Sequence, residues 1–163
     1  MTYHLRRKDR EITDPGALEQ IIQQHRYAVI ALCRDNEPYI VTLDYGYDSE
    51  NRVLYFHCAK EGKKIDFIKA NPKACATIIA EGAQTSDICD HTYKSVVLNG
   101  MIELVDSKPE SDKAINSMIE QLEKKQPERF RRKLDPSHKS YVNLQILKMK
   151  ISEMTGKERV AKA

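Results

Sequence analysis

The amino-acid sequence predicts a mainly β fold, a six-stranded antiparallel barrel with peripheral helices. Six segments are rich in Val, Ile, Leu and Tyr, and short turns separate the first three of them. Helix-type spacing of apolar residues is confined to a few segments before and between these strands. A parallel sheet would need a helical crossover after nearly every strand, so this order of elements favours an antiparallel barrel.

The composition is that of a globular protein without a strong charge of either sign. The chain has 163 residues, which suits a single domain over residues 1–163, and its 27 basic and 24 acidic residues give a net charge of +3. This balance argues against nucleic-acid binding. The N-terminus is polar, and no run of about 18 apolar residues occurs. We therefore expect a cytoplasmic protein with neither a signal peptide nor a membrane helix.

The first half of the chain is predicted to contain one helix and three strands. Residues 1–12 are expected to form an extended, charged arm. Asp14 is a good N-cap and Pro15 suits the first helical position, so a helix is expected from there to about His25. Alternating or Val- and Ile-rich sequences predict strands over residues 27–34, 39–47 and 53–58. One face of the second strand is expected to carry Tyr39, Val41, Leu43, Tyr45 and Tyr47.

The second half is predicted to add helices and three more strands. A helix over residues 63–70 stops before Pro72, and Ser107-x-x-Glu110 predicts a capping box at the start of a longer helix. The basic segment 129–139 is expected to form a helical turn and a loop. Strands are predicted over residues 74–80, 94–105 and 141–151, followed by a polar tail over residues 152–163.

Two positions in the predicted strands indicate irregular pairing. Gly100 lies inside a strand, where a glycine often marks a bend or the close approach of another backbone. In the last strand, the apolar side switches between Ile146 and Leu147. Such a switch predicts either a bulge or a strand with apolar side chains on both faces.

The junction between the third strand and the following helix has the features of a phosphate site. Lys60, Lys63 and Lys64 surround Gly62, where the strand passes into the helix. The first helical turn exposes backbone N–H groups at the positive end of the helix dipole, and the lysines add charge. The alternative is a solvated helix start. Because cations there oppose the dipole by about 0.3–1 kcal/mol each, such a cluster lowers stability unless an anion binds.

The cysteines do not indicate a disulfide framework or a metal site. Four of them lie at irregular spacing without a Cys-x-x-Cys pair, so we expect reduced thiols. Cys89-Asp90-His91 supplies two metal-ligand types, whereas a structural zinc site usually has four ligands. We therefore expect a loop there and no metal. Cys58 lies in an apolar strand, where a buried thiol is usually inert.

Four stretches in order along the chain carry a family resemblance. They are LRRKDREI (5–12), PYIVTLDYGY (38–47), LYFHCAKEGKKIDFIKANP (54–72) and YKSVVLNG (93–100). On these stretches the chain resembles the pyridoxamine 5′-phosphate oxidase-like flavoproteins, and within them the nitroimidazole-resistance branch. The resemblance implies a split β-barrel of the FMN-binding type that forms a homodimer, with FMN in a cleft between the subunits.

The resemblance also implies particular cofactor contacts and an activity. The second strand would lie along the isoalloxazine ring mainly through backbone groups, and the junction described above would hold the phosphate. The implied cofactor-binding residues are Val41, Thr42, Leu43, His57, Lys60, Lys63, Lys64, Lys94 and Ser95. The implied activity is an oxidoreductase that passes electrons from a reduced donor to a small acceptor, for example a nitroaromatic compound. His57 stands out as the candidate catalytic proton donor.

Two alternatives for the function remain open. His57 lies between Phe56 and Cys58, where it could also be a histidine of the barrel wall or an axial haem ligand, a role that His91 could share. A haem-binding barrel is therefore one alternative, and a non-enzymatic ligand-binding barrel is the other. Oxidation of pyridoxamine phosphate itself is not expected, because the oxidase's basic residues on the second strand and its C-terminal Arg-x-His pattern are missing from this sequence.

Overall fold

The computed structural model describes residues 5–80, 92–123, 125–133, 138 and 143–160. Its elements follow one another as η1 (Lys8–Arg10), α1 (Pro15–Gln24), β1 (Tyr27–Arg34), β2 (Glu37–Asp48), β3 (Val53–Ala59), α2 (Lys63–Ala70), β4 (Lys73–Ala80), β5 (Tyr93–Val105), α3 (Lys108–Leu122), α4 (Pro127–Lys133) and β6 (Leu144–Arg159). Most predicted strands and helices are confirmed to within a few residues.

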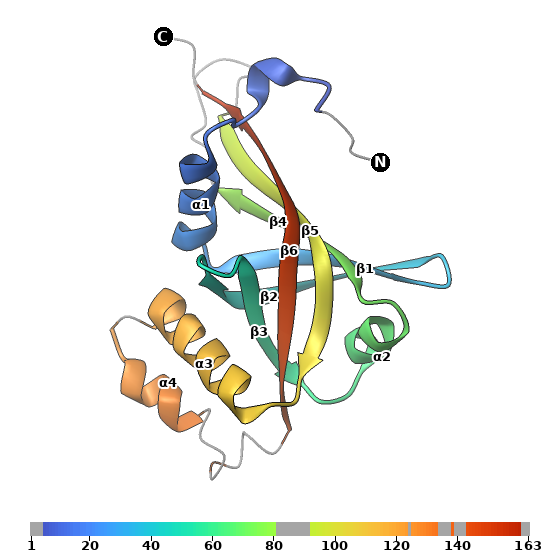
Figure 1. Ribbon diagram of the computed structural model, residues 1–163, viewed down its shortest axis with the longest axis vertical. Helices are drawn as coiled ribbons and strands as arrows, with labels where there is room; N and C mark the ends of the chain where they lie inside the picture. Colours follow the sequence, from blue (N-terminus) through green and yellow to red (C-terminus); the bar gives the residue numbers. More distant parts are fainter. Residues whose placement is uncertain (1–4, 81–91, 124, 134–137, 139–142, 161–163) are drawn as a thin grey trace.

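The six strands form a closed antiparallel barrel in the order β1-β2-β3-β6-β5-β4 (Figure 1). The predicted fold class is therefore confirmed. Alternate residues of each strand point inward, as the period of two along a strand requires. On β2 the inward face is the predicted one, with Tyr45 fully buried and Tyr39, Val41, Leu43 and Tyr47 packed against the core.

Two short helices complete the barrel core. α1 buries Leu18, Ile21 and Ile22, and its N-cap Asp14 accepts a hydrogen bond from the Gly16 N–H at 2.9 Å, as predicted. α2 adds Ile65, Phe67 and Ile68 to the same apolar cluster. Both helices thus bury one apolar stripe against the inside of the barrel.

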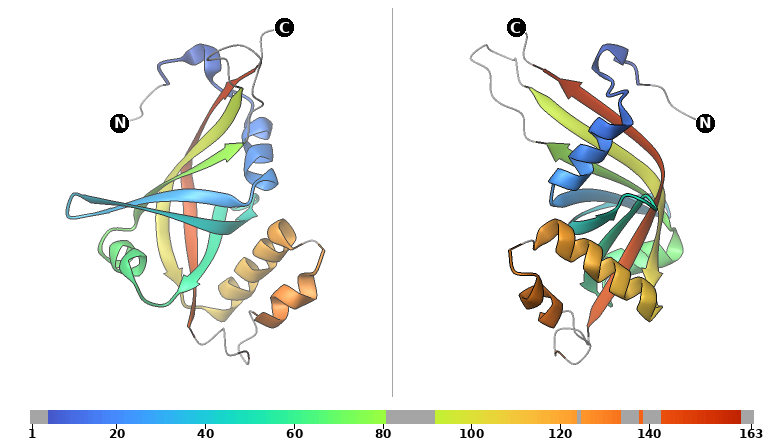
Figure 2. Two further views of the ribbon diagram at one scale, coloured as in Figure 1. Left: turned by 180° about the vertical axis from the view of Figure 1, so that it is seen from behind. Right: turned by 60° about the vertical axis from the view of Figure 1, so that its left-hand side comes forward.

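The third helix, α3, packs on the outside of β2, β3 and β6 (Figure 2). Gly46 allows this contact, because a Cβ at that position would lie 2.3 Å from the Met118 backbone nitrogen. Ile146 is buried in the cluster beneath α3, whereas Leu147 is buried inside the barrel. The switch of apolar side in the last strand therefore reflects apolar side chains on both faces.

A bulge does occur between β5 and β6, but at another place. The pairing changes register from Asn99↔Glu153 to Gly100↔Ile151, which leaves Ser152 as the extra residue. A Cβ at Gly100 would lie 2.1 Å from the Lys150 carbonyl oxygen. The predicted close backbone approach at Gly100 is thus confirmed.

The predicted polar tail over residues 152–163 is wrong for its first eight residues. β6 continues to Arg159 and pairs with β5 as far as Tyr93↔Arg159. The edge of β5 supplies hydrogen-bond partners that a local reading of this polar sequence does not reveal. The N-terminal arm is also less extended than predicted, because it forms η1, and the N–H of buried Ile12 then donates to the Gly156 carbonyl at 3.0 Å.

Candidate functional site

The ladder between β2 and β3 covers only part of both strands. β2 pairs with β1 from Glu37 to Asp44, but with β3 only from Tyr45 to Asp48. β3 continues as His57–Ala59, paired on its other side with β6. We call the unpaired region between residues 40–44 of β2 and residues 57–60, which form the end of β3 and the residue after it, the β2–β3 opening. The β2 edge that faces it lies beyond the β2–β3 ladder, and such an edge presents backbone N–H and C=O groups to a ligand.

The predicted ring-binding residues lie on this edge. Val41 and Leu43 pack inward against the core, while Thr42 is exposed on the outer face. A ligand outside the barrel would therefore meet the backbone of Val41 and Leu43 and the side chain of Thr42. This arrangement agrees with contact mainly through the backbone.

His57 lies across the opening from Asp44. The Asp44 carboxylate accepts a hydrogen bond from the Arg26 guanidinium at 3.0 Å. Burial lowers the pKa of His57, and the charge of Asp44 partly opposes that effect. The neutral imidazole is thus the favoured form near pH 7, and in this form one ring nitrogen donates and the other accepts a hydrogen bond. Sequence reasoning missed the Arg26–Asp44 pair, since Arg26 lies in a linker without a motif.

The three lysines around Gly62 divide into two groups. Gly62 has φ +121°, a backbone conformation that favours glycine, and its carbonyl accepts from the Ile65 N–H at 2.8 Å. Lys60 is exposed, and Lys64 is half-buried. Burial raises the pKa of the Cys58 thiol, and the nearby charge of Lys64 partly opposes that effect. Among the described residues, neither of these two lysines forms an ion pair.

The third lysine is already engaged. The Nζ of Lys63 lies 2.6 Å from Glu37 Oε1 and 5.2 Å from the ring centres of both Tyr39 and Phe67. Its charge is therefore matched by a carboxylate and by two aromatic faces. Lys60, Lys64 and the positive end of the α2 dipole are therefore the groups available to bind a phosphate.

Lys94 and Ser95 lie away from the other predicted site residues. They begin β5 at the end of the barrel that is remote from α2 (Figure 1). The Lys94 Nζ forms an ion pair with Glu158 at 3.0 Å, and Ser95 points to the opposite face of the strand. The other predicted residues, 41–43, His57, Lys60 and Lys64, lie around the β2–β3 opening of a single chain. Lys94 and Ser95 do not.

The outer face of β2, β1, β4 and β5 carries exposed apolar side chains. The register places Thr42, Val29, Thr77 and Val97 in one row across the four strands. The large exposed apolar residues are Tyr27, Ile40, Ile79, Val97 and Met101. Ile40 and Ile79 are 65% and 62% exposed, which is unusual for isoleucine. The outward phase of these residues in their strands is the sequence signal that could have predicted this patch.

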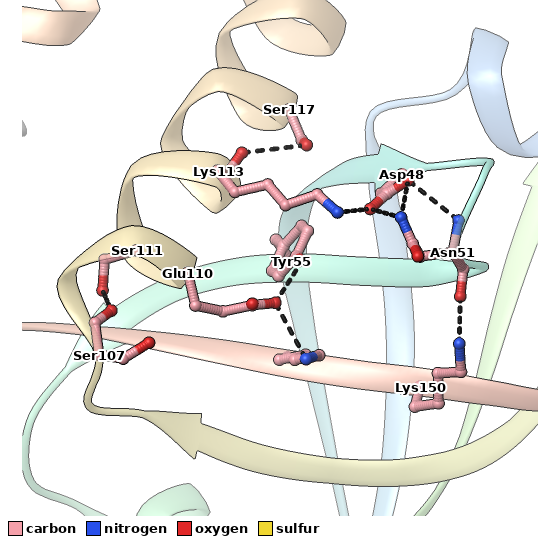
Figure 3. A network of polar contacts seen from close by, with 10 residues as sticks. Asp48, Asn51, Tyr55, Ser107, Glu110, Ser111, Lys113, Ser117 and Lys150 are labelled. Atoms are coloured by element: carbon pink, nitrogen blue, oxygen red, sulfur yellow. Dashed lines mark hydrogen bonds and ion pairs between the residues drawn. The ribbon is translucent and has the colours of Figure 1, made fainter.

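A second polar cluster lies under α3 (Figure 3). The Tyr55 hydroxyl donates to Glu110 Oε1 at 2.6 Å, and Lys148 Nζ lies 2.9 Å from the same oxygen. Lys113 pairs with Asp48 at 2.7 Å. Tyr55, Glu110, Lys113 and Lys148 border a cleft of about 310 Å³. Every cation named here faces a carboxylate, so the cluster fastens α3 to the barrel.

The capping box predicted at the start of α3 is wrong. The Ser107 side chain makes no capping bond, and its carbonyl accepts from the Ser111 hydroxyl at 3.0 Å. Glu110 reaches Tyr55 and Lys148 instead of the helix end. A buried hydroxyl and a lysine thus compete successfully with the local cap.

Within the described residues, no group of three or more His, Cys, Asp or Glu side chains is arranged to hold a metal ion. Cys89, Asp90 and His91 lie outside the described residues, as does most of the loop predicted around them. No helix in the described part of the chain is long and apolar enough to cross a membrane.

Comparison with known proteins identifies relatives with this architecture. A protein from Bacteroides thetaiotaomicron, described as a candidate 5-nitroimidazole antibiotic resistance protein, shares 24% identity with a TM-score of 0.75 over 91% of this chain and 86% of its own. The flavocytochrome Anf3 from Azotobacter vinelandii shares 17% with a TM-score of 0.77 over 98% of this chain and 74% of its own. At these identities the likeness shows the fold alone.

Sequence comparison gives one curated relative and one family. The uncharacterized protein RA0666 from Rhizobium meliloti is 41% identical over 73 residues, which are 45% of this chain and 42% of that protein. The chain thus matches less than half of the relative's length. The family model for pyridoxamine 5′-phosphate oxidase matches residues 14–158, which include all six strands of the barrel except the last residue of β6. The chain therefore belongs to the pyridoxamine 5′-phosphate oxidase family.

Proposed function

We propose that this protein is a homodimeric flavoprotein that binds FMN at the β2–β3 opening and passes electrons from a reduced donor to a small acceptor. The observation that carries the proposal is the opening itself. It brings together a strand edge, a half-buried histidine and a helix N-terminus with two lysines lacking ion pairs among the described residues. These are the groups that a flat ring with hydrogen-bonding edges and a phosphate tail requires.

The phosphate would bind at the N-terminus of α2. Lys64 and Lys60 supply charge there, and the first-turn N–H groups and the dipole of α2 act in the same direction. Without an anion, the same lysines oppose the dipole. The flexible backbone at Gly62 lets the chain turn sharply into this helix, so the lysines flank its first turn.

The ring would lie on the edge of β2 at residues 41–43. Backbone groups there hydrogen-bond its polar edge, and Thr42 contacts it from the outer face. Bound FMN would supply the electron-transfer chemistry, while the protein orients the ring and excludes competing reactions. His57, held neutral by burial, can exchange a proton with a bound acceptor or donate a hydrogen bond to the ring.

The second subunit would cover the exposed apolar face. An exposed apolar face that includes Ile40, Ile79 and Met101 is a feature of protein interfaces. In a dimer with two-fold symmetry, the same patch of each subunit forms the contact, so this one face is sufficient for both subunits. In such a dimer, Ser95 of one copy, which is on the same face of β5 as exposed Val97, would approach the flavin of the other copy, whereas Lys94 would first have to leave its ion pair with Glu158.

The relatives support a flavin and suggest an acceptor. A structural relative from Mesorhizobium loti is described as an FAD-binding protein, with 21% identity and a TM-score of 0.68. The Bacteroides thetaiotaomicron relative connects this architecture with nitroimidazole compounds, so a nitroaromatic acceptor is the first to test. Because Anf3 is a flavocytochrome, haem is the competing cofactor.

An absorption spectrum of the purified protein, followed by mass analysis of the released ligand, tests the proposal. FMN gives two bands between the near ultraviolet and the blue, whereas haem gives a single intense Soret band. We expect the FMN spectrum, or its recovery on adding FMN, and a dimer in solution that Ile40→Glu with Ile79→Glu converts to a monomer. A Soret band, or no binding of any flavin, would contradict the proposal.

A further inference from the structure

One face of α2 lies along the β1–β2 hairpin. Lys63, Phe67 and Asn71 are four residues apart, so they form a single stripe on the helix. Figure 2 shows α2 beside the base of the projecting hairpin. The hairpin turns at Asp35 and Asn36, whose φ angles of 49° and 64° are those of a tight two-residue turn. We call this surface the α2–hairpin contact.

Each residue of the stripe touches the hairpin. Lys63 Nζ lies 2.6 Å from Glu37 Oε1. The Phe67 ring lies 5.3 Å from the Tyr39 ring, centre to centre, in a tilted arrangement. The Asn71 Nδ2 donates to the Cys33 carbonyl at 2.9 Å. The contact therefore runs the whole length of α2, from its first residue to its C-cap.

The contact joins the two halves of the proposed cofactor site. The N-terminus of α2 would hold the phosphate, and β2, which begins at Glu37 in the same hairpin, would hold the ring. No β2–β3 pairing ties these two parts together at this level, because that ladder stops at Tyr45. The spacing between ring edge and phosphate site thus depends on how α2 packs against the hairpin.

We propose that Glu37, Lys63 and Asn71 are positioning residues that set this spacing and so make the protein select a flavin with a phosphate over one without. The inference rests on the proposed function. It assigns Lys63 a role through Glu37, not as a phosphate ligand. A ligand held at both ends gains from pre-organisation only while the two half-sites keep the right separation. Riboflavin, which lacks the phosphate, is held at the ring end alone and does not gain in this way.

The test compares dissociation constants for FMN and riboflavin. Glu37→Ala removes the partner of Lys63, and Asn71→Asp removes the donor to Cys33 while keeping the oxygen that accepts from Lys73 N–H. Combining the two variants should weaken FMN binding about three- to tenfold and change riboflavin binding less than about twofold. Asp35→Asn on the same hairpin is the matched control. It breaks only the Arg34–Asp35 pair and should leave both constants unchanged.

A double-mutant cycle separates positioning from direct phosphate binding by Lys63. If Lys63 acts through Glu37, Lys63→Gln and Glu37→Ala weaken FMN binding by similar factors, and the double variant is no weaker than either one. If Glu37→Ala leaves FMN binding unchanged or tightens it, the inference is overturned. The same holds if both flavins weaken equally, since that is loss of structure. A wild-type protein that binds FMN no better than riboflavin would instead contradict the phosphate site of the proposed function.

Discussion

Two lysine-rich clusters flank β3, and they differ in how their charges are matched. Under α3, Lys113 and Lys148 each face a carboxylate, and Glu110 also accepts from buried Tyr55. At the start of α2, Lys60 and Lys64 form no ion pair among the described residues and oppose the helix dipole. The first arrangement stabilises the folded chain by itself. The second is stabilising only when an anion is present, which is why it is the proposed phosphate site.

Replacing both unpaired lysines should have the largest effect on ligand binding. Lys60→Gln with Lys64→Gln removes two charge-assisted contacts to a phosphate, so FMN affinity should fall about ten- to a hundredfold. The apo-protein should not lose stability and should gain up to about 2 kcal/mol, because the substitutions remove two cations that oppose the α2 dipole and that have no charged partner among the described residues. Fluorescence titration with FMN and urea unfolding measure the two effects. If the apo-protein lost stability while its FMN affinity stayed the same, these lysines would have a structural role like those under α3, and the proposed phosphate site would be contradicted.

The opposite result is expected under α3. Glu110→Ala leaves the Tyr55 hydroxyl, on a fully buried residue, and the Lys148 ammonium without their shared acceptor. The free energy of unfolding should fall by about 1–3 kcal/mol. FMN affinity at 25 °C should remain within about twofold. Asp112→Ala, which breaks the exposed Lys108–Asp112 pair on the same helix, is the control and should cost less than about 0.5 kcal/mol.

The two regions should also respond to acid in different pH ranges. Tyr55 and Lys148 lower the pKa of Glu110 below its ordinary value of 4.5. The unfolded chain therefore takes up this proton first, and the stabilisation by Glu110, complete above about pH 4.5, is lost as the pH falls through the lower folded value. Urea unfolding of the wild type and of Glu110→Gln, followed below pH 5, should show a shallower decline for the variant. Parallel curves would contradict this assignment.

The smallest expected effect belongs to His57. Burial lowers its pKa below 6.5 in the folded protein, so the unfolded chain binds a proton that the native protein does not. The stability of the apo-protein should accordingly begin to fall as the pH drops below 6.5, before Glu110 titrates. Comparison of the urea midpoints at pH 7.5 and 5.5 in wild type and His57→Gln measures this contribution. An equal change in both proteins would show that His57 is not its source.

Strand identity and order could be predicted because apolar alternation and turn residues are local signals. β1 occupies the predicted residues 27–34, and the phase of β2 is correct. The last eight residues of β6 could not be predicted, because their pairing depends on the distant edge of β5. The capping box was mispredicted for the same reason, because Glu110 bonds to Tyr55 and Lys148 on other elements.

The candidate site was predictable as a set of residues but not as an arrangement. The lysines around Gly62 and the position of His57 follow from a strand-to-helix junction visible in the sequence. That Lys63 is already paired with Glu37 depends on how the β1–β2 hairpin lies against α2. The separation of Lys94 and Ser95 from the opening likewise requires the barrel topology, since both lie in a strand that resembles its neighbours.

A crystal structure of the protein grown with excess FMN tests the central claim most directly. We predict phosphate oxygens within hydrogen-bond distance of Lys64 Nζ at the start of α2, and the ring along the backbone of residues 41–43. A flavin bound elsewhere, or a β2–β3 opening filled by the protein's own side chains, would contradict the account.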